Sequence, residues 1–210
     1  MKIAVIGTGS VGGTLGRRWA QKGHEVIFCS RTPESEKVRA LLDASGPRSR
    51  SASIKEGVGD CDVVVVATPW PVTLETIDSA GSIDGKIVVD CTNALKADLS
   101  GPSLPANTSA AEQIAAHAKG ARVVKAFNTI PYTTMDDPTF GAQRADLFLC
   151  GDDAKAKSTV AQLARDLGLD VVDTGPLHVA KHLEYLASLW IYMAFEGGWG
   201  RNFTFKVLKR

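Results

Sequence analysis

Residues 7–12 read GTGSVG and have the types and spacing of a dinucleotide-binding turn. They follow a short apolar run and open a helical pattern, which is the context that such a turn requires. Gly7 permits a tight turn, Gly9 lets the backbone approach a pyrophosphate, and Gly12 allows close packing of helix on strand. Because free N–H groups at the start of a helix attract anions, we expect this turn to bind a dinucleotide. The alternative is a glycine turn that binds nothing.

Residues 30–35, which read SRTPES, follow the next apolar run and bear on the choice of dinucleotide. A chain that binds NAD usually carries an acid at this position for the ribose hydroxyls. Ser30 and Arg31 can instead donate hydrogen bonds to a 2′-phosphate, and Arg31 can do so with two N–H groups. The loop therefore favours NADP(H). Alternatively, Arg31 is a solvated arginine that pairs with Glu34 or Glu36.

Apolar runs rich in Val and Ile alternate with helical patterns along the chain, which predicts the elements that position these residues. Strands that are apolar on both faces and separated by helices are typical of an α/β fold, here a Rossmann-type, doubly wound, mostly parallel sheet with a small C-terminal helical part. Ser109 and Glu112 have the spacing of a capping box, and glycines at 23, 120 and 168 follow predicted helices. The predicted strands are 2–7, 24–30, 62–67, 86–92, 122–128, 146–151 and 170–175.

Composition limits the class of partner. The 210 residues include 24 Lys and Arg against 23 Asp and Glu, a net charge of +1, so no overall field favours nucleic acid or an acidic membrane surface. A small molecule is the expected partner. The four cysteines stand singly among apolar residues, and we expect reduced core thiols of a cytoplasmic protein rather than a metal site: Cys29, Cys61, Cys91 and Cys150.

The two ends of the chain carry no membrane signal. The first ten residues lack the pattern of a signal peptide. The apolar stretch 183–195 is too short to span a bilayer and contains Glu184, so we expect a buried or interface helix there.

Two long segments, 92–109 and 128–143, interrupt the alternation of strands and helices. Both should follow the carboxyl ends of strands, where open α/β sheets bind ligands, so they are candidate walls of a site. The alternative is that they are surface insertions without a role.

Five stretches resemble a known family when they are taken in order with the fingerprint at 7–12. They are SRTPES, VVVVATPW at 63–70, SAAEQIAAHAKGARVVKAFNTIP at 109–131, CGDDAKAK at 150–157 and DTGPLHVAKHLEYL at 173–186. Together they resemble the NADPH-dependent coenzyme F420 reductases, whose dinucleotide domain also occurs in the STEAP metalloreductases. The resemblance implies an NADP-binding domain at 1–150 and a C-terminal part, 151–210, that completes a cleft in which a deazaflavin stacks on the nicotinamide.

The resemblance also implies roles for particular residues. Around the cofactor it places Thr8, Gly9, Ser10 and Val11 at the pyrophosphate, within the turn that Gly7 and Gly12 shape. It places Ser30 and Arg31 at the 2′-phosphate, with Ser35 as a secondary candidate, and Ala67, Thr68, Pro69 and Asn93 beside the nicotinamide half. Around the acceptor it places Asn128, Thr129, Ile130 and Pro131, and we expect the turn of Gly175, Pro176 and His178 to complete that wall. A plain exit from a strand is the alternative for residues 129–131.

Some features do not follow from this resemblance. His178 and His182 have i, i+4 spacing, but no third ligand is evident, so we expect solvent-facing or pocket-lining histidines and no metal. Trp190, Tyr192 and Trp199 are bulky enough to narrow a deazaflavin pocket, which leaves the identity of the acceptor open.

The expected reaction needs no catalytic acid. Hydride transfer between a nicotinamide and a flavin-like ring depends on orientation, stacking distance and exclusion of water. The alternatives are a flavin or quinone reductase that takes FMN or FAD from solution, and a non-catalytic NADPH sensor. A β-hydroxyacid dehydrogenase is a weaker rival, because Lys181 and Glu184 depart from its Lys-x-x-Asn turn.

The C-terminal region also predicts assembly and charge. Leu183, Leu186, Ala187, Trp190, Met193 and Ala194 recur at helical spacing and must pack on the sheet or on a second copy, and we expect a homodimer. Arg201, Lys206, Lys209 and Arg210 form a basic end that is either solvated or attracts an acidic acceptor.

Overall fold

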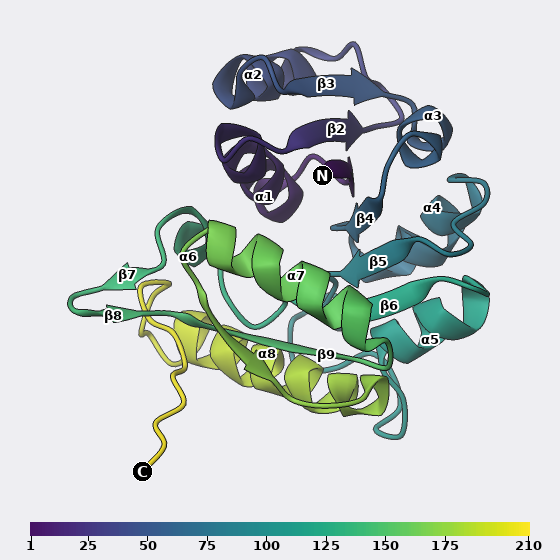
Figure 1. The fold of residues 1–210 in the computed structure, drawn as a ribbon. Coiled ribbons are helices and arrows are strands. Elements are labelled where there is room, and N and C mark those ends of the chain that lie inside the picture. The colour runs from purple at the N-terminus through teal and green to yellow at the C-terminus, as the bar shows by residue number, and fades with distance from the viewer.

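The computed structural model describes all 210 residues and contains one eight-stranded sheet. Six neighbouring strands run parallel in the order β3-β2-β1-β4-β5-β6, the strand order of a dinucleotide-binding fold (Figure 1). The predicted α/β, Rossmann-type class is confirmed. The strands of this sheet are β1 Lys2–Ile6, β2 Glu25–Cys29, β3 Ser49–Ala52, β4 Val63–Val66, β5 Ile87–Asp90, β6 Arg122–Lys125, β9 Asp146–Gly151 and β10 Asp170–Asp173.

The last two strands run in the opposite direction to the other six. β9 pairs antiparallel with β6, with Cys150 opposite Lys125, and β10 pairs parallel with β9. The carboxyl ends of β9 and β10 therefore lie toward the amino ends of the six parallel strands. The chain that follows β10 therefore runs toward the end of the parallel strands that is opposite to the glycine fingerprint.

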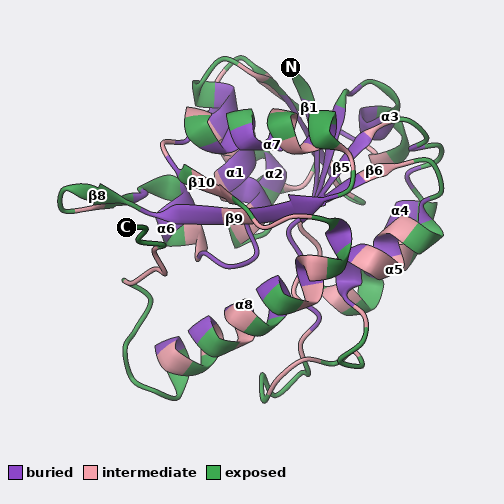
Figure 2. Cartoon of the chain, turned by 60° about the horizontal axis from the view of Figure 1, so that its bottom comes forward, coloured by how far each residue is buried: buried purple, intermediate pink, exposed green.

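Helices cover both faces of the sheet, and Figure 2 shows α1, α2 and α7 on one side and α4, α5 and α8 on the other. On the first side, Trp19 of α1 is fully buried and its indole N–H donates to the carbonyl of Leu163 in α7, at 3.0 Å. On the second side, Ile114 of α5 and Leu183 of α8 join one apolar cluster. The helices are α1 Ser10–Gln21, α2 Glu36–Ser45, α3 Ile54–Gly59, α4 Thr73–Asp78, α5 Ala110–His117, α6 Tyr132–Asp136, α7 Ala154–Asp166 and α8 Ala180–Phe195.

Several local predictions are confirmed. Ser109 caps α5 by accepting from the N–H of Glu112, at 3.2 Å, which is one half of the predicted capping box; the Glu112 carboxylate accepts from the Ser109 hydroxyl, at 2.7 Å, rather than from the Ser109 N–H. Glycines 23, 120 and 168 take φ values of +94°, +83° and +90° after their helices, a conformation in which side chains are strained. The segment 128–143 is more ordered than expected, because it holds α6 and the hairpin β7 Thr139–Phe140 with β8 Gln143–Arg144.

Helix α8 packs its predicted apolar stripe on its own chain. Within this stripe Leu183, Ala187, Trp190 and Ala194 are buried. The opposite side of the helix exposes a second apolar row, which consists of Tyr185, Leu189, Tyr192 and Phe195. The residues after α8 fold back on it, because the indole N–H of Trp190 donates to the carbonyl of Phe203 at 3.1 Å and the two rings stack.

All four cysteines are buried and free, as predicted. Burial raises the pKa of the Cys29 and Cys150 thiols to about 12. None of the helices combines the length and apolarity needed to cross a membrane.

Candidate functional site

The glycine fingerprint forms a tight cradle where β1 passes into α1. Gly7 has φ +108°, and a Cβ there would lie 2.5 Å from the carbonyl oxygen of Ala67, so no side chain fits. A Cβ on Gly12 would collide with the carbonyl of Gly7. Gly9 differs, because a Cβ there would meet nothing within 4 Å and would point into open space. Gly7 and Gly12 are therefore required by the fold, whereas Gly9 keeps space free above the helix terminus.

Helix α1 begins over this cradle without any capping side chain. Its N-cap is Gly9, no acid lies in its first turn, and the first N–H groups have no partner within the helix. This is the arrangement that attracts a phosphate, since unpaired N–H groups and the positive end of the helix dipole act together.

A hollow of about 490 Å³, the fingerprint hollow, opens from this cradle toward β2 and α2. It reaches the ends of β1, β2 and β4, which all stop at the same edge of the sheet. Eight predicted cofactor residues line it: Gly7, Thr8, Gly9, Ser30, Arg31, Ala67, Thr68 and Pro69. The residues predicted for a pyrophosphate and those predicted for a 2′-phosphate thus face one cavity.

Arg31 is exposed at this hollow and takes no part in an ion pair, so the predicted alternative pairing with Glu34 or Glu36 is not formed. Ser35 does not line the hollow but serves as the N-cap of α2. Lys37, in the first turn of that helix, does line it and was missed. The signal for Lys37 was available, because a lysine that opens the helix after the Ser30–Arg31 loop lies on the same side as that loop.

A second hollow of about 360 Å³, the α8 hollow, lies on the other side of the α1 terminus. The fingerprint connects the two hollows, because Thr8 and Gly9 line the first while Ser10 and Val11 line the second. The predicted residues on the α8 hollow are Ser10, Val11, Asn93, Asn128, Thr129, Ile130 and Pro131. The sequence did not predict Tyr132, Ala187, Ile191, Phe195 and Arg201 there. Of the three bulky residues expected to narrow the acceptor pocket, Trp190 lines this hollow, whereas Tyr192 and Trp199 do not.

Asn93 and Asn128 hold each other at the floor of the α8 hollow. The side-chain amide of Asn93 donates to the backbone carbonyl of Asn128 at 2.9 Å, and that of Asn128 donates to Oδ1 of Asn93 at 3.0 Å. Asn128 also donates to the carbonyl of Leu183 in α8, at 3.1 Å. These bonds join the exits of β5 and β6 to α8.

Two buried oxygens at this floor have no hydrogen-bond partner within the protein. They are Oδ1 of Asn128 and Oγ1 of Thr129, whose residues are 6% and 2% exposed. A buried polar atom without a partner costs about 1–3 kcal/mol, so a ligand with complementary groups would gain by pairing with them. The residue before them, Phe127, is fully buried with φ +64°, which is strained for a bulky side chain.

A buried ion cluster lies beneath Asn93 and Asn128. The ammonium of Lys125, fully buried, donates to Asp90 at 2.9 Å, to Glu184 of α8 at 2.8 Å and to the carbonyl of Thr92 at 2.6 Å. Glu184 also accepts from the N–H of Ala110, at 2.9 Å. The cluster therefore ties α8 to both ends of the segment 92–109.

Burial shapes the pKa values in this cluster. Desolvation raises the pKa of Glu184, although Lys125 opposes this change. Burial alone would lower the pKa of Lys125, but Asp90 and Glu184 outweigh it and the pKa is raised.

The turn of Gly175, Pro176 and His178 does not line the α8 hollow, and the expectation that it forms a wall there is wrong. The carbonyl of Gly175 accepts from the N–H of Gly151, at the end of β9. Because β9 and β10 are reversed, this turn lies toward the amino ends of the parallel strands. Its role in the fold is to connect β10 to α8. His178 and His182 are both exposed, and no group of three or more metal-ligating side chains is present.

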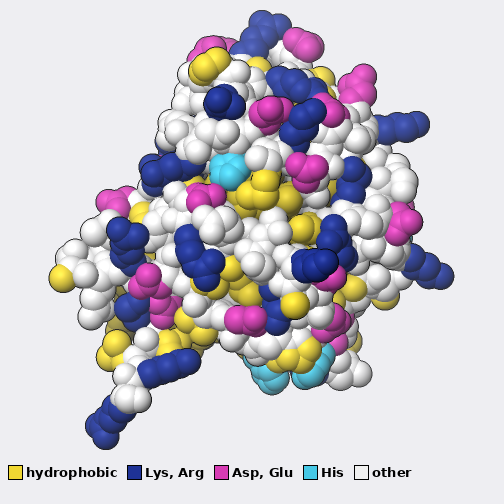
Figure 3. Space-filling model, in the orientation of Figure 1, with side chains coloured by type: hydrophobic (Ala, Val, Ile, Leu, Met, Phe, Trp, Pro, Cys, Tyr) yellow, Lys and Arg dark blue, Asp and Glu magenta, His cyan; other side chains and the backbone are white.

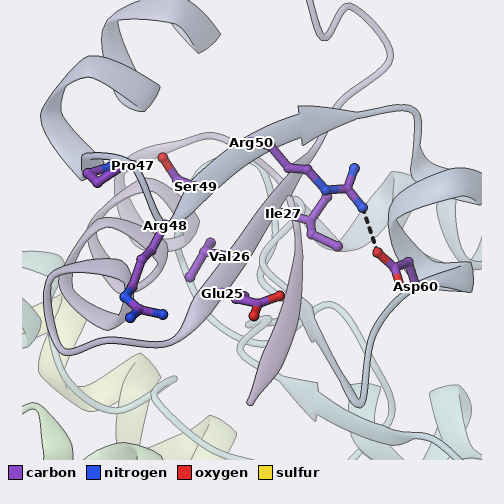
Figure 4. Close-up of a pocket in the computed structure, with 8 residues that line it drawn as sticks. All are labelled: Glu25, Val26, Ile27, Pro47, Arg48, Ser49, Arg50 and Asp60. Atoms are coloured by element: carbon purple, nitrogen blue, oxygen red, sulfur yellow. Dashed lines mark hydrogen bonds and ion pairs between the residues drawn. The ribbon is translucent and has the colours of Figure 1, made fainter.

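Another hollow, of about 510 Å³, lies beside β2 and β3 (Figure 4). It faces the amino ends of these strands, away from the edge where such sheets bind ligands. Two of the four charged residues that line it are paired with each other, since Arg50 contacts Asp60 at 3.0 Å, and Asp60 also contacts Lys2 at 3.0 Å. We assign it no role.

The chain is similar in sequence and structure to several known reductases. The family model described as NADP oxidoreductase, coenzyme F420-dependent, matches residues 2–94. The F420-dependent NADP reductase of Methanothermobacter thermautotrophicus is 30% identical over 205 residues, which cover 91% of this chain and 88% of that protein. The crystal structure of a protein proposed to be an F420-dependent NADP reductase, from Arthrobacter sp. FB24, superposes over 100% of both chains with a TM-score of 0.90 and 33% identity. The metalloreductase STEAP3 of Rattus norvegicus is 28% identical over 87% of this chain, which spans 36% of that protein.

Proposed function

Because this chain belongs to the family of F420-dependent NADP reductases, we propose that it transfers a hydride between NADP(H) and coenzyme F420, a 5-deazaflavin. The family relationship makes it an NADP-dependent oxidoreductase. The observation that carries the finer proposal is the pair of hollows joined across the α1 terminus. One carries Arg31 and Lys37 for the phosphates of NADP(H), with Glu75 as the single acid in its lining, and the other would hold the two rings.

The residues of the fingerprint hollow fit NADP(H). Gly9 leaves space for the pyrophosphate over the free N–H groups of α1, and no acid stands in the first turn to repel it. Arg31, Ser30 and Lys37 would donate to the 2′-phosphate. Ala67, Thr68 and Pro69 line the same hollow and would lie beside the nicotinamide half of the cofactor. Ser35 does not line it and, as the N-cap of α2, would act only by positioning the N–H groups of that helix terminus.

The residues of the α8 hollow would orient the rings. NADPH supplies a hydride from C4 of its nicotinamide and leaves as NADP⁺, while the acceptor takes up that hydride and one proton from water. Ser10, Val11 and Asn93 lie nearest the cofactor side, and residues 128–131 with Trp190 and Ile191 form the remaining walls. No titratable side chain of this hollow is needed, because the protein contributes position and exclusion of water.

The C-terminal part completes this cleft. We therefore keep a functional division at residue 150, with 1–150 holding NADP(H) and 151–210 supplying α8 to the acceptor side. We also propose a cytoplasmic enzyme, supported by the four free and buried thiols, which are typical of a reducing compartment.

We further propose that the enzyme is a homodimer. The exposed row of α8, Tyr185, Leu189, Tyr192 and Phe195, is between 44% and 56% exposed and is apolar enough to favour contact with a second copy. Light scattering should give twice the chain mass of 22.3 kDa. Leu189→Glu should shift the mass toward the monomer. A monomer at micromolar concentration in the unmutated protein would refute the dimer.

Turnover with a panel of acceptors tests the proposed activity. NADPH oxidation should be fastest with coenzyme F420, slower with FMN or FAD, and slowest with quinones. A preference for FMN or a quinone would make the enzyme a flavin or quinone reductase. The absence of any acceptor-dependent oxidation, with NADPH still bound, would favour a sensor.

A bulky residue in the α8 hollow provides a structural test. Ile191→Trp should lower the rate with the acceptor at least tenfold while NADPH affinity stays within a few-fold, because orientation of the reacting atoms is lost. Lys119→Trp, at an exposed site that lines neither hollow, is the control and should leave both unchanged. Equal losses of NADPH affinity and rate in Ile191→Trp would place the cofactor, not the acceptor, against this wall.

A further inference from the structure

The α8 hollow is lined by one charged side chain, Arg201. The other lining residues are apolar or neutral and polar, and the unpartnered oxygens of Asn128 and Thr129 lie at the buried floor. Arg201 is exposed, and none of the ion pairs in the structure includes it. The hollow is therefore neutral inside and carries a free positive charge at its rim.

The position of Arg201 is set by the fold of the segment after α8. Its guanidinium carbon lies 5.0 Å from the centre of the Phe195 ring, a cation–π contact. The N–H groups of Trp199 and Gly200 donate to the carbonyls of Met193 and Ala194, both at 3.1 Å. Phe203 then stacks on Trp190 with ring centres 5.0 Å apart. Arg201 is consequently held beside the hollow between two anchored points.

The other basic residues of the C-terminal end do not share this position. Lys206 is bound by Asp146 at 2.7 Å and by Asp170 at 2.9 Å, so its charge is neutralised locally. Lys209 and Arg210 are exposed at the chain terminus, which projects from the body of the protein (Figures 1 and 3). Of the four residues of the predicted basic end, only Arg201 lines the α8 hollow.

We propose that Arg201 determines specificity by binding an anionic group, a phosphate or a carboxylate, that the acceptor carries on a side chain of its ring. This inference rests on the proposed function. A neutral aromatic ring suits the interior, whose lining is apolar or neutral and polar. The charged end of the molecule would then stay at the rim, where it keeps much of its water and meets a guanidinium that suits phosphate and carboxylate geometry.

FMN and riboflavin form a matched pair of probes, because they share one ring and differ by a phosphate. Coenzyme F420 and its deazaflavin ring carrying only the ribityl chain form a second pair. Arg201→Gln should raise the KM for FMN and for F420 about fivefold to tenfold, while the KM for the uncharged partner of each pair changes less than twofold. The KM for NADPH and the kcat should stay unchanged. Arg210→Gln is the matched control and should leave all four KM values as they are.

Other outcomes overturn the inference. If Arg201→Gln raises the KM equally for charged and uncharged acceptors, Arg201 acts on the ring of the acceptor rather than on its charged side chain. No preference for FMN over riboflavin in the unmutated enzyme, or an unchanged preference in Arg201→Gln, would also refute it. If no acceptor is reduced, the proposed function fails instead. In that case the quenching of tryptophan fluorescence by FMN and riboflavin still measures whether Arg201 binds the phosphate.

Discussion

Replacing Lys125 by methionine removes the single cation from a buried cluster that contains two carboxylates. Lys125 is fully buried, and Asp90 and Glu184 are 0% and 5% exposed. Breaking a buried ion pair by deleting one partner costs about 3–5 kcal/mol, because the remaining charge is left without compensation. Here the deletion also leaves the carbonyl of Thr92 without its donor. The loss is comparable to a large part of the total stability of a typical domain, about 5–15 kcal/mol.

Urea unfolding followed by tryptophan fluorescence measures this loss. A change of about 4 kcal/mol, with a slope of about 2 kcal/mol per molar urea, lowers the midpoint by roughly 2 M. Lys2→Met is the matched control, since Lys2 pairs with Asp60 at the surface and should leave the midpoint nearly unchanged.

The pH dependence identifies the cause. In Lys125→Met the folded pKa of Glu184, already raised by burial, rises further above its unfolded value. The stability deficit should therefore be largest when the pH exceeds this folded pKa, and it should shrink as the pH falls toward the ordinary pKa of glutamate. Adding Glu184→Gln to Lys125→Met removes one of the two carboxylates and should restore part of the stability at pH 8. The reasoning is refuted if Lys125→Met lies within 1 kcal/mol of the unmutated protein at pH 8, or if the second substitution destabilises it further.

Three further predictions concern the cofactor site and the thiols. NADPH should bind at least tenfold more tightly than NADH, a difference of about 1.4 kcal/mol in binding free energy. Arg31→Ala should erase most of this difference, whereas Arg39→Ala, at an exposed site outside the hollow, should leave it unchanged. Equal dissociation constants for the two cofactors in the unmutated protein would contradict this prediction. Gly9→Val should fold normally but lose NADPH binding, whereas Gly12→Val should lower the melting temperature because its side chain collides with the backbone of Gly7. A folded Gly9→Val that binds NADPH normally would rule out the fingerprint as the site. The four buried thiols should not react with dithiobis(nitrobenzoate) at pH 8 until the protein is unfolded, and rapid labelling of the native protein would contradict their burial and raised pKa values.

The parts of the fold that the sequence predicts are those whose physics is local. The fingerprint is recognisable because Gly7 and Gly12 stand where backbone atoms leave no room for a Cβ. β4 is recognisable because a strand buried on both faces reads as a continuous apolar run. β3, which reads SRSA, has no such run, since an edge strand needs little apolar surface, and the sequence pattern did not reveal it.

The errors arise where the physics is not local. An apolar run predicts a strand but not its direction, so the reversal of β9 and β10 was not foreseen and the 175–178 turn was assigned to the wrong edge. Lys125 and Glu184 are 59 residues apart, and nothing near either residue indicates that they meet. The sequence pattern groups Arg201 with a basic tail, because spacing alone does not distinguish a residue beside a cavity from one in solvent.

Isotope transfer tests the central claim most directly. NADPH in which deuterium replaces the transferred hydrogen at C4 of the nicotinamide is mixed with the enzyme and coenzyme F420. The reduced coenzyme is then examined by mass spectrometry. Direct hydride transfer between the two rings predicts one deuterium on C5 of the deazaflavin, a carbon that does not exchange with water. The experiment is run with NADPH labelled at each of the two C4 hydrogens in turn. If the reduced coenzyme carries no deuterium in either case, direct transfer within the α8 hollow is contradicted.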